Sequence, residues 1–209
     1  MQGLETLRAW VKESRGMVFF GGAGVSTESG IPDFRSADGL YSRKMDVSPE
    51  VLLSHRYFMK HPEAFFRFYR DFMTAKGVQP NAAHRTLAAW EAQGRLRAII
   101  TQNIDGLHQA AGSTNVLELH GSIHRNHCMQ CARAFGLEAI LTDAPVPRCP
   151  CGGIIKPDVV LYEESLPEAA WEGSVRALSE ADLLIVGGTS LTVYPAAGLI
   201  DAFCGKRLV

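Results

Sequence analysis

The stretch "MVFFGGAGVST", residues 17–27, decides the fold of this 209-residue chain. Its first four residues are apolar, as in a buried strand, and they lead directly into a glycine-rich loop. A loop of this kind after a strand is typical of a dinucleotide-binding turn, whose fingerprint is G-x-G-x-x-G. Gly22 and Gly24 fit the fingerprint, whereas Thr27 stands where its last glycine belongs. The sequence therefore predicts a nucleotide-binding turn of unusual form.

Further strands and helices alternate along the chain. The apolar runs Arg97–Thr101 and Leu183–Val186 predict buried strands, and another strand is expected at Val116–Leu119. Segments of helical character are expected at 4–14, between Asn81 and Gly94, at 167–179 and at 195–203. This alternation indicates an α/β fold, with a Rossmann-like parallel sheet that carries helices on both faces.

Three loops follow the predicted strands and share one kind of chemistry. They are "GGAGVST", "TQNIDGLH" and "GGTSLTVYP", and each is rich in glycine, amide or hydroxyl groups. Ligands of open parallel sheets bind beyond the carboxyl ends of the strands, where these loops lie. Such groups suit the recognition of phosphate, ribose and amide, so a nucleotide site is predicted there.

Four of the five cysteines form two closely spaced pairs, Cys128 with Cys131 and Cys149 with Cys151. Four thiolates from two tight turns are a typical ligand set for tetrahedral zinc, and they leave no open position for catalysis. We therefore expect a structural zinc ion. Four unrelated buried cysteines are the alternative interpretation, and His124 and His127 are alternative ligands.

The composition bears on partners and compartment. A formal net charge of -1 gives no electrostatic reason to expect nucleic acid or a membrane surface as partner. Paired cysteines of a metal type are typical of a reducing compartment, and we expect a cytoplasmic protein. The fifth cysteine, Cys204, lies in an apolar segment and is expected to be buried and inert. The oligomeric state is not predicted.

Three polar positions are candidates for chemistry. His120 ends an apolar strand and precedes a glycine, so it is a candidate general base near neutral pH or a histidine that only makes structural hydrogen bonds. Asn103 and Asp105 directly follow a strand and either form a turn or hold an amide-bearing ligand and a ribose. Asp33-Phe34-Arg35, taken alone, indicates a turn with a surface ion pair.

Together these motifs resemble the sirtuins, the NAD-dependent protein-lysine deacylases. The matching stretches are "GAGVSTESGIPDFRS", "TQNIDGLHQAAG", "LHGS", the paired cysteines, "KPDVVLYEESLP" and "GGTSLTVYPA", in the family's order over residues 21–197. The resemblance implies a modified nucleotide fold whose first loop continues into a flexible cofactor-covering segment and not directly into a helix. Position 27 then need not be a glycine, and threonine is compatible with the loop.

The resemblance also implies roles for individual residues. His120 would be the general base, and it would be assisted at the catalytic centre by Asn103. The cofactor-binding residues would be Gly22, Ala23, Gly24, Thr27, Phe34, Arg35, Gln102, Asn103, Ile104, Asp105, Thr189 and Ser190. Val160, Leu161 and Tyr162 would pair as a strand with an acetylated-lysine protein or peptide.

The resemblance implies three parts: a Rossmann-like NAD-binding domain at 1–36, 80–123 and 154–209, a helical insert at 37–79 and a zinc-binding insert at 124–153. The implied reaction consumes NAD and releases nicotinamide, O-acetyl-ADP-ribose and free lysine. ADP-ribosyl transfer from NAD, a dehydrogenase, and a zinc-ribbon interaction module without catalysis are the alternative functions.

Three features depart from the family's pattern. Tyr162-Glu163-Glu164 stands where "F-G-E" is usual, and a carboxylate there is expected to favour basic flanks on the peptide. Tyr69 is followed three residues later by Phe72, whereas relatives that prefer acidic acyl groups carry Tyr-x-x-Arg, so we expect a preference for acetyl. The chain stops at Val209, within "GKRLV", and a longer form is expected to bind NAD more tightly.

Overall fold

The computed structural model of the chain describes residues 2–37, 39–42, 45–74 and 77–209. Its main sheet has five strands in the order β3-β2-β1-β7-β8, and every neighbouring pair is parallel. The strands are β1 (Met17–Gly21), β2 (Leu96–Thr101), β3 (Val116–Glu118), β7 (Leu183–Gly187) and β8 (Arg207–Leu208). The parallel sheet predicted from the apolar runs is confirmed.

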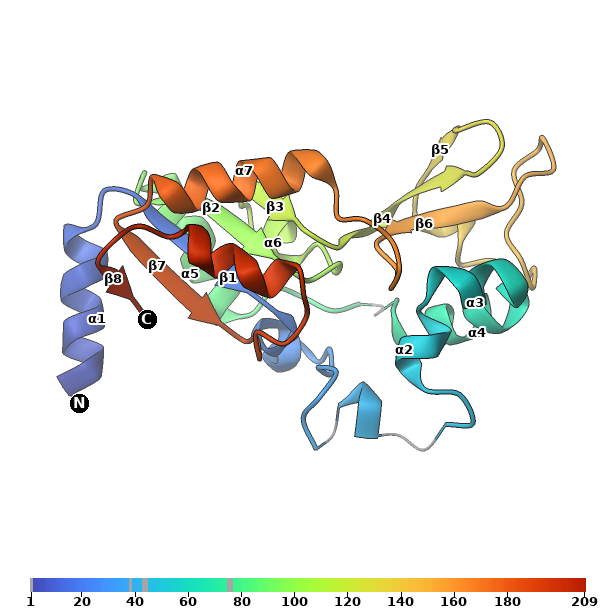
Figure 1. Cartoon of the computed structure of the whole chain (residues 1–209), viewed down its shortest axis with the longest axis horizontal. Coiled ribbons are helices and arrows are strands. Elements are labelled where there is room, and N and C mark those ends of the chain that lie inside the picture. Colours follow the sequence, from blue (N-terminus) through green and yellow to red (C-terminus); the bar gives the residue numbers. More distant parts are fainter. Residues whose placement is uncertain (1, 38, 43–44, 75–76) are drawn as a thin grey trace.

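Helices cover both faces of this sheet (Figure 1). Met17 and Phe19 of β1 pack with α1 (Gln2–Glu13) and α5 (Ala82–Ala92) on one face. Val18 and Phe20 pack on the other face with α7 (Glu168–Ser179) and the 3₁₀ helix η4 (Ala196–Ala202). Because alternate residues of a strand point to opposite faces, a strand buried on both sides is a continuous apolar run.

The ends of two helices depend on local chemistry. The expected cap of α5 is present, because the Asn81 side chain accepts hydrogen bonds from the backbone of Ala83 and His84. The helix predicted at 195–203 is a 3₁₀ helix that ends at Ala202. The chain then becomes extended, and Cys204 is exposed. The prediction of a buried Cys204 was therefore wrong.

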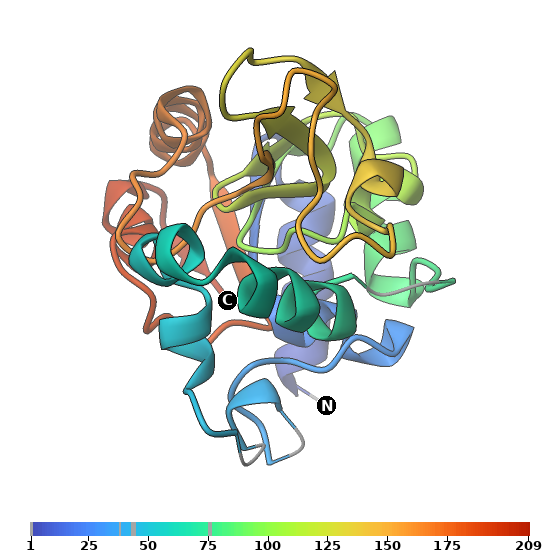
Figure 2. The ribbon, with the colours of Figure 1, turned by 90° about the vertical axis from the view of Figure 1, so that its right-hand side faces the viewer.

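A second, antiparallel sheet lies with the helical insert at the end of the molecule opposite α1, the end that faces the viewer in Figure 2. It consists of β4 (Gly121–Cys128), β5 (Ala134–Phe135) and β6 (Ile155–Val159), and η3 (Leu137–Ala139) follows β5. The insert comprises η2 (Leu40–Ser42), α2 (Pro49–Leu52), α3 (His55–Lys60) and α4 (Pro62–Phe72). This small sheet reaches beyond the expected range 124–153 at both of its ends.

The insert and the small sheet share one hydrophobic core, which is separate from the two cores of the main sheet. Aromatic side chains of α3 and α4, among them Phe58, Phe65 and Tyr69, pack there with Ile123 of β4 and Val159 of β6. The crowded aromatic residues of the insert thus form a core. In the described part of the chain, no helix has the length and apolar character needed to cross a bilayer.

Candidate nucleotide and substrate site

The three polar loops meet at the carboxyl edge of the main sheet, as predicted. The Gly22 N–H donates to the Gly187 carbonyl at 3.2 Å, and the Gly24 N–H donates to the Gly188 carbonyl at 2.8 Å. The third loop joins them, because the Thr189 hydroxyl donates to the Gln102 side-chain oxygen at 3.0 Å. The loops after β1, β2 and β7 therefore form one interlocked surface.

Glycine is required where these loops touch. A Cβ atom on Gly22 would lie 2.8 Å from the Gly188 carbonyl oxygen, and one on Gly24 would lie 2.8 Å from the Gly188 Cα. Gly188 itself has φ +64°, in the region that favours glycine. The two glycines that match the dinucleotide fingerprint thus permit close backbone approach.

Thr27 does not occupy a close contact of this kind. It lies in the 3₁₀ helix η1 (Ala23–Ser29), and its hydroxyl donates to the Gly24 carbonyl at 3.0 Å. The loop therefore enters a short helix at once, which differs from the flexible segment that the resemblance implied. A longer irregular stretch follows from Gly30 to Gly39, as far as its residues are described.

A buried serine links the first two loops. The Ser26 hydroxyl donates to Asp105 Oδ2 at 2.7 Å, and the Asn103 side-chain NH₂ donates to the Ser26 oxygen at 3.1 Å. Asp105 Oδ1 also accepts from the Leu107 N–H at 2.9 Å, at the start of α6 (Leu107–Ala110). Asp105 is thus both a turn former and part of the polar cluster. Sequence reasoning missed Ser26, although it lies inside the glycine-rich motif.

His120 is held in one tautomer. Its Nδ1 lies 3.0 Å from the Gln102 carbonyl oxygen, and because a carbonyl can only accept, Nδ1 carries the proton. Burial lowers the pKa of His120 below its ordinary value, and the hydrogen bond to Gln102 opposes this only in part. At neutral pH the ring is therefore neutral, and Nε2 has the lone pair that a base needs.

The segment that carries Phe34 and Arg35 turns on Asp33. The Asp33 carboxylate accepts hydrogen bonds from the backbone of Arg35 at 3.0 Å and of Ser36 at 2.7 Å, and the Ser36 bond is the main cause of a lowered Asp33 pKa. The Arg35 guanidinium lies 5.4 Å from the centre of the Tyr41 ring. The expected turn is confirmed, but the ion pairs of the described residues do not include Asp33 with Arg35.

The expected substrate strand is already bonded within the chain. The Val160 N–H donates to the His120 carbonyl, and the Leu161 N–H donates to Glu164 Oε2 at 2.9 Å. The Tyr162 N–H donates to the Leu53 carbonyl at 3.0 Å. The Leu161 and Tyr162 carbonyls already accept from the N–H groups of Glu164 and His55, each at 3.0 Å. A peptide that pairs with this segment would therefore have to share these acceptors or use the Val160 carbonyl.

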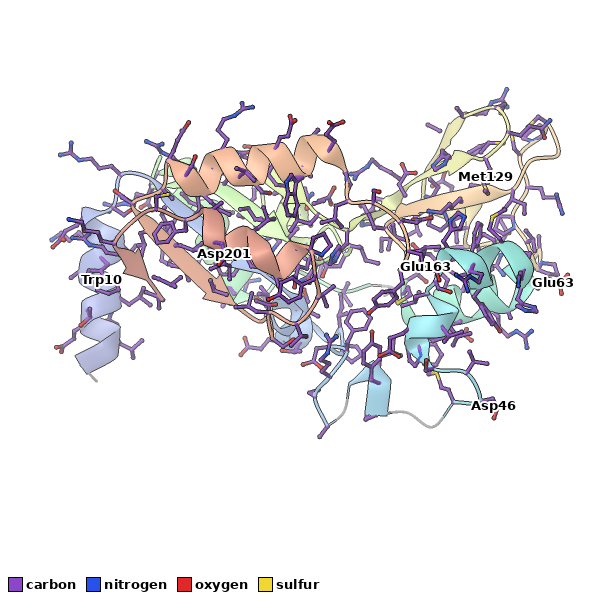
Figure 3. All side chains as sticks on the ribbon, in the orientation of Figure 1. Trp10, Asp46, Glu63, Met129, Glu163 and Asp201 are labelled. Carbon is purple, nitrogen blue, oxygen red and sulfur yellow. The ribbon has the colours of Figure 1, made fainter. Side chains whose placement is uncertain are left out.

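Glu163 adopts an uncommon backbone conformation and lies beside the insert (Figure 3). Its φ is +78°, in the left-handed region that favours the glycine of the family's usual pattern. Its carboxylate accepts from the Arg56 N–H at 3.1 Å and lies 3.5 Å from the Arg56 guanidinium. This pairing offsets the charge that was expected to favour basic peptide flanks.

The carboxylate of the neighbouring Glu164 makes several contacts within the chain. Its carboxylate accepts from Lys156 Nζ at 3.2 Å and contacts His55 Nδ1 at 2.8 Å. Lys156 is buried in β6 and also donates to the Val159 carbonyl. Hydrogen bonds from Leu161 and His55 and the Lys156 charge lower the Glu164 pKa despite its burial. Sequence reasoning missed this network, because His55 lies 109 positions before Glu164 in the chain.

The four paired cysteines converge in space. Their sulfur atoms all lie within 4.8 Å of one another, with 3.4 Å between Cys128 and Cys151 and 3.6 Å between Cys131 and Cys149. Four ligands around zinc at about 2.3 Å would be separated by about 3.8 Å, so the cluster fits a structural zinc site. The alternative of four unrelated cysteines is excluded.

The two nearby histidines point elsewhere. His124 Nε2 donates to the Asp105 carbonyl at 3.1 Å, and His127 Nδ1 bonds to the Asp158 carboxylate. Neither belongs to the cysteine cluster. The cluster thus consists of the four cysteines expected from their spacing.

The fold and these loops define a class: a Rossmann-like nucleotide-binding α/β protein with a four-cysteine metal module. A family profile described as "Sir2 family" matches residues 22–195. The chain belongs to the Sir2 family.

Individual relatives agree with this assignment. A protein of Clostridium acetobutylicum, named NAD-dependent protein deacetylase, is 60% identical over an alignment of 210 positions. The alignment covers 99% of this chain and 86% of that protein. A protein of the same name from Cutibacterium acnes is 56% identical, with 98% and 85% covered.

Solved structures of the family are also similar. A Sir2 protein with a p53 peptide and NAD+ has a TM-score of 0.86 at 40% identity, covering 98% of this chain and 84% of that one. A Sir2 protein with a deacetylated p53 peptide and 3'-O-acetyl-ADP-ribose has a TM-score of 0.90 at 39% identity, with 98% and 85% covered.

Proposed function

We propose that this protein removes acetyl groups from protein lysines with NAD as co-substrate, and that nicotinamide, O-acetyl-ADP-ribose and free lysine are the products. One observation carries the proposal. The ring of His120 bonds to Gln102 in the second nucleotide loop, while its backbone carbonyl accepts from Val160 in the substrate segment. A neutral base thus lies between the nucleotide loops and the substrate segment.

The residues present fit NAD. Among the described residues, the side-chain NH₂ of Gln102 is buried without a hydrogen-bond partner, where the three loops meet. NAD, when bound, supplies the glycosidic bond that is cleaved and the ribose that receives the acetyl group. The proposed cofactor contacts remain those implied by the resemblance, from Gly22 through Ser190.

In the proposed reaction, the chain's own residues would orient NAD and remove a proton from its ribose. We assign to His120 Nε2 the removal of a proton from a ribose hydroxyl, because the tautomer leaves that nitrogen free of a proton. Asp105, held by Ser26, would bind the carboxamide, and Asn103 would bind ribose in the same cluster. Well-positioned groups of this kind lower the barrier by orienting the reacting atoms.

The partners of the proposed reaction are acetylated-lysine proteins or peptides, and the substrate segment is Val160, Leu161 and Tyr162. The relative named NAD-dependent protein deacetylase and the Sir2 structure with a p53 peptide and NAD+ support this choice. We also propose that the chain divides into the NAD-binding domain, helical insert and zinc insert expected from the resemblance, and that the protein acts in the cytoplasm. Free cysteines, as found for all five, suit a reducing compartment.

The test is to incubate the protein with NAD and acetyl-lysine peptide and to identify the products by mass spectrometry. Nicotinamide with O-acetyl-ADP-ribose supports the proposal. ADP-ribosylated protein would favour the transferase alternative, and NADH absorbance would favour a dehydrogenase. A protein whose melting temperature does not respond to NAD would favour the zinc-ribbon module.

A parallel incubation with succinyl-lysine peptide tests the acyl preference. Tyr69 is fully buried in the insert core, and Phe72 offers no positive charge to an acidic acyl group. Deacetylation should therefore be faster than desuccinylation, and the reverse order would contradict this part of the proposal.

A further inference from the structure

Two tyrosine hydroxyl groups join the two halves of the site. The nucleotide half is formed by the three polar loops and the segment that carries Phe34 and Arg35, and the substrate half by the substrate segment and the helical insert. Tyr41 lies in η2, at the end of the segment that carries Phe34 and Arg35, and Tyr162 ends the substrate segment. Their hydroxyl oxygens are 2.8 Å apart, although the residues are separated by 121 positions. This contact exists because tyrosine stands at 162, where the family's usual residue is phenylalanine.

Tyr41 is tied to the nucleotide half by three further contacts. Its N–H donates to the Phe34 carbonyl at 2.8 Å, and its ring meets the Phe34 ring edge-on with centres 5.7 Å apart. The Arg35 guanidinium lies over the same ring. A change in the position of Tyr41 therefore moves both residues that the resemblance assigns to the cofactor. Burial, followed by the Tyr162 hydrogen bond, raises the Tyr41 pKa, so the phenol stays neutral.

Tyr162 is tied to the substrate half through its backbone. Its N–H donates to the Leu53 carbonyl and its carbonyl accepts from the His55 N–H, each at 3.0 Å. These bonds hold it against the helical insert, next to the Glu163–Arg56 contact. The Tyr162 backbone is thus held in place, and its hydroxyl bonds to Tyr41 at the end of the segment that carries Phe34 and Arg35. That segment is called the cofactor segment below.

We propose that the hydroxyl pair of Tyr41 and Tyr162 preorders the cofactor segment and couples NAD binding to occupancy of the substrate site. Tyr162 is then a positioning residue for NAD, in addition to its place beside the peptide. The inference rests on the proposed function. Between Gly30 and Leu40 the described residues have irregular backbone. If such a segment became ordered only when NAD binds, the entropy lost on ordering would weaken the affinity for NAD.

The size of the effect follows from the exposure of the pair. Tyr162 is 37% exposed, so water competes for its hydroxyl when the bond breaks. A hydrogen bond of this kind contributes roughly 0.5–1.5 kcal/mol net, which corresponds to about two- to tenfold in affinity. The proposal therefore predicts a modest and measurable coupling.

The test uses the variants Tyr162→Phe, Tyr41→Phe and the double variant, each of which removes only hydroxyl oxygens. NAD affinity is measured by calorimetric titration, with and without the deacetylated lysine peptide, because the acetylated peptide would be consumed together with NAD during the titration. Each single variant should bind NAD about two- to tenfold more weakly, and the double variant should be no weaker than either single one, because all three lose the same bond. Peptide should also improve NAD affinity less in the variants than in the wild type, and peptide and NAD must influence each other equally.

The matched control is Tyr57→Phe, which removes a hydroxyl from α3 of the same insert and should bind NAD like the wild type. Steady-state kinetics should show a rise in KM for NAD that exceeds any change in kcat. Unchanged or tighter NAD binding in Tyr162→Phe, or additive losses in the double variant, would overturn the inference. Failure of the wild type to bind NAD at all would instead refute the proposed function.

Discussion

At the scale of single residues, two histidines, one half-buried and one buried, differ in how their ring nitrogens are used. His120 donates from Nδ1 to the Gln102 carbonyl and keeps Nε2 as an acceptor. His108, in α6, is 1% exposed, and neither of its ring nitrogens has a hydrogen-bond partner among the residues that the structure describes. The first arrangement suits a base, whereas the second belongs to a histidine that packs as a neutral ring.

Removal of the proposed base should abolish turnover and spare binding. His120→Ala is expected to lower kcat about 10²–10⁴-fold, because a positioned general base contributes that much, while NAD still binds. His120→Asn is the sharper variant, since its amide N–H can keep the bond to Gln102 without a basic nitrogen. Deacetylation rates and calorimetric NAD titration provide the measurements. A His120→Asn protein with most of the original activity would remove this residue from the role.

The packing of His108 predicts a pH-dependent stability. Burial, with the neighbouring His84 as the next cause, lowers the His108 pKa to about 4, whereas unfolded histidine has a pKa of about 6.5. Between these values the unfolded chain binds the proton and the native chain does not, so stability falls as the pH falls. From pH 7.5 to pH 5.5 this residue alone should remove about 1.4 kcal/mol.

Urea denaturation at both pH values measures the loss, and His108→Leu is the comparison. Leucine sacrifices no hydrogen bond there, because the ring nitrogens make none. The variant should lose less stability over this interval than the wild type, by about 1.4 kcal/mol. An equal loss in both proteins would show that His108 is not the source.

At the scale of elements, the small sheet depends on its four cysteines. β5 has two residues and β6 has five, and the sulfur cluster joins the turn between β4 and β5 to the segment between β5 and β6. Elements this short rarely form an independent core, and metal binding supplies folding free energy to such modules. The sulfur cluster therefore stabilises the strands that lead to the substrate segment.

Metal analysis should find one zinc per chain. Cys128→Ser and Cys149→Ser should each lose the metal together with solubility or deacetylation, because a buried ligand is removed. Cys204→Ser is the matched control, since Cys204 is exposed and lies outside the cluster, and it should keep its zinc. Active wild-type protein without zinc would contradict the prediction.

The elements show what the sequence could predict. β1, β2 and β7 were predictable because buried parallel strands are apolar throughout, and the cysteine cluster was predictable from its spacing. β8 and β5 have two residues each, which is too short for periodicity to appear. The exposure of Cys204 depends on where η4 ends, which its apolar neighbours do not indicate.

The site was predictable to the extent that its residues lie in contiguous motifs. The three loops and His120 were found in this way, and the contacts between the loops confirm that they meet. The contacts of Glu164 with His55 and of Tyr41 with Tyr162 join residues more than 100 positions apart. No local pattern contains such pairs, so only the fold could reveal them.

At the scale of the whole molecule, the chain crosses between the two sheets at His120. β4 begins at Gly121, directly after the histidine, and β6 ends at Val159, directly before the residue that bonds to the His120 carbonyl. The two crossings lie side by side. The geometry of the proposed base therefore depends on how closely they approach.

Gly121 is the residue that permits this approach. Its φ is +76°, and a Cβ atom there would lie 1.7 Å from the Asp158 carbonyl oxygen. Gly121→Ala should therefore destabilise the protein by about 2–4 kcal/mol, from backbone strain and overpacking together, and should lower activity. Gly3→Ala is the control, because no described atom lies within 4 Å of the added atom and alanine favours the helix. Chemical denaturation of both variants provides the measurement, and equal stability would refute the argument.

The separation of the hydrophobic cores has a consequence for cooperativity. One core holds the insert with the small sheet, and two others hold the main sheet with its helices. In the free protein, amide hydrogen exchange should therefore report two opening units with different free energies. In the proposed function, NAD and peptide together would contact both units, on either side of His120. Ligation should make the slow amides of the two units exchange at a common rate, so catalysis would occur in a molecule that opens as one.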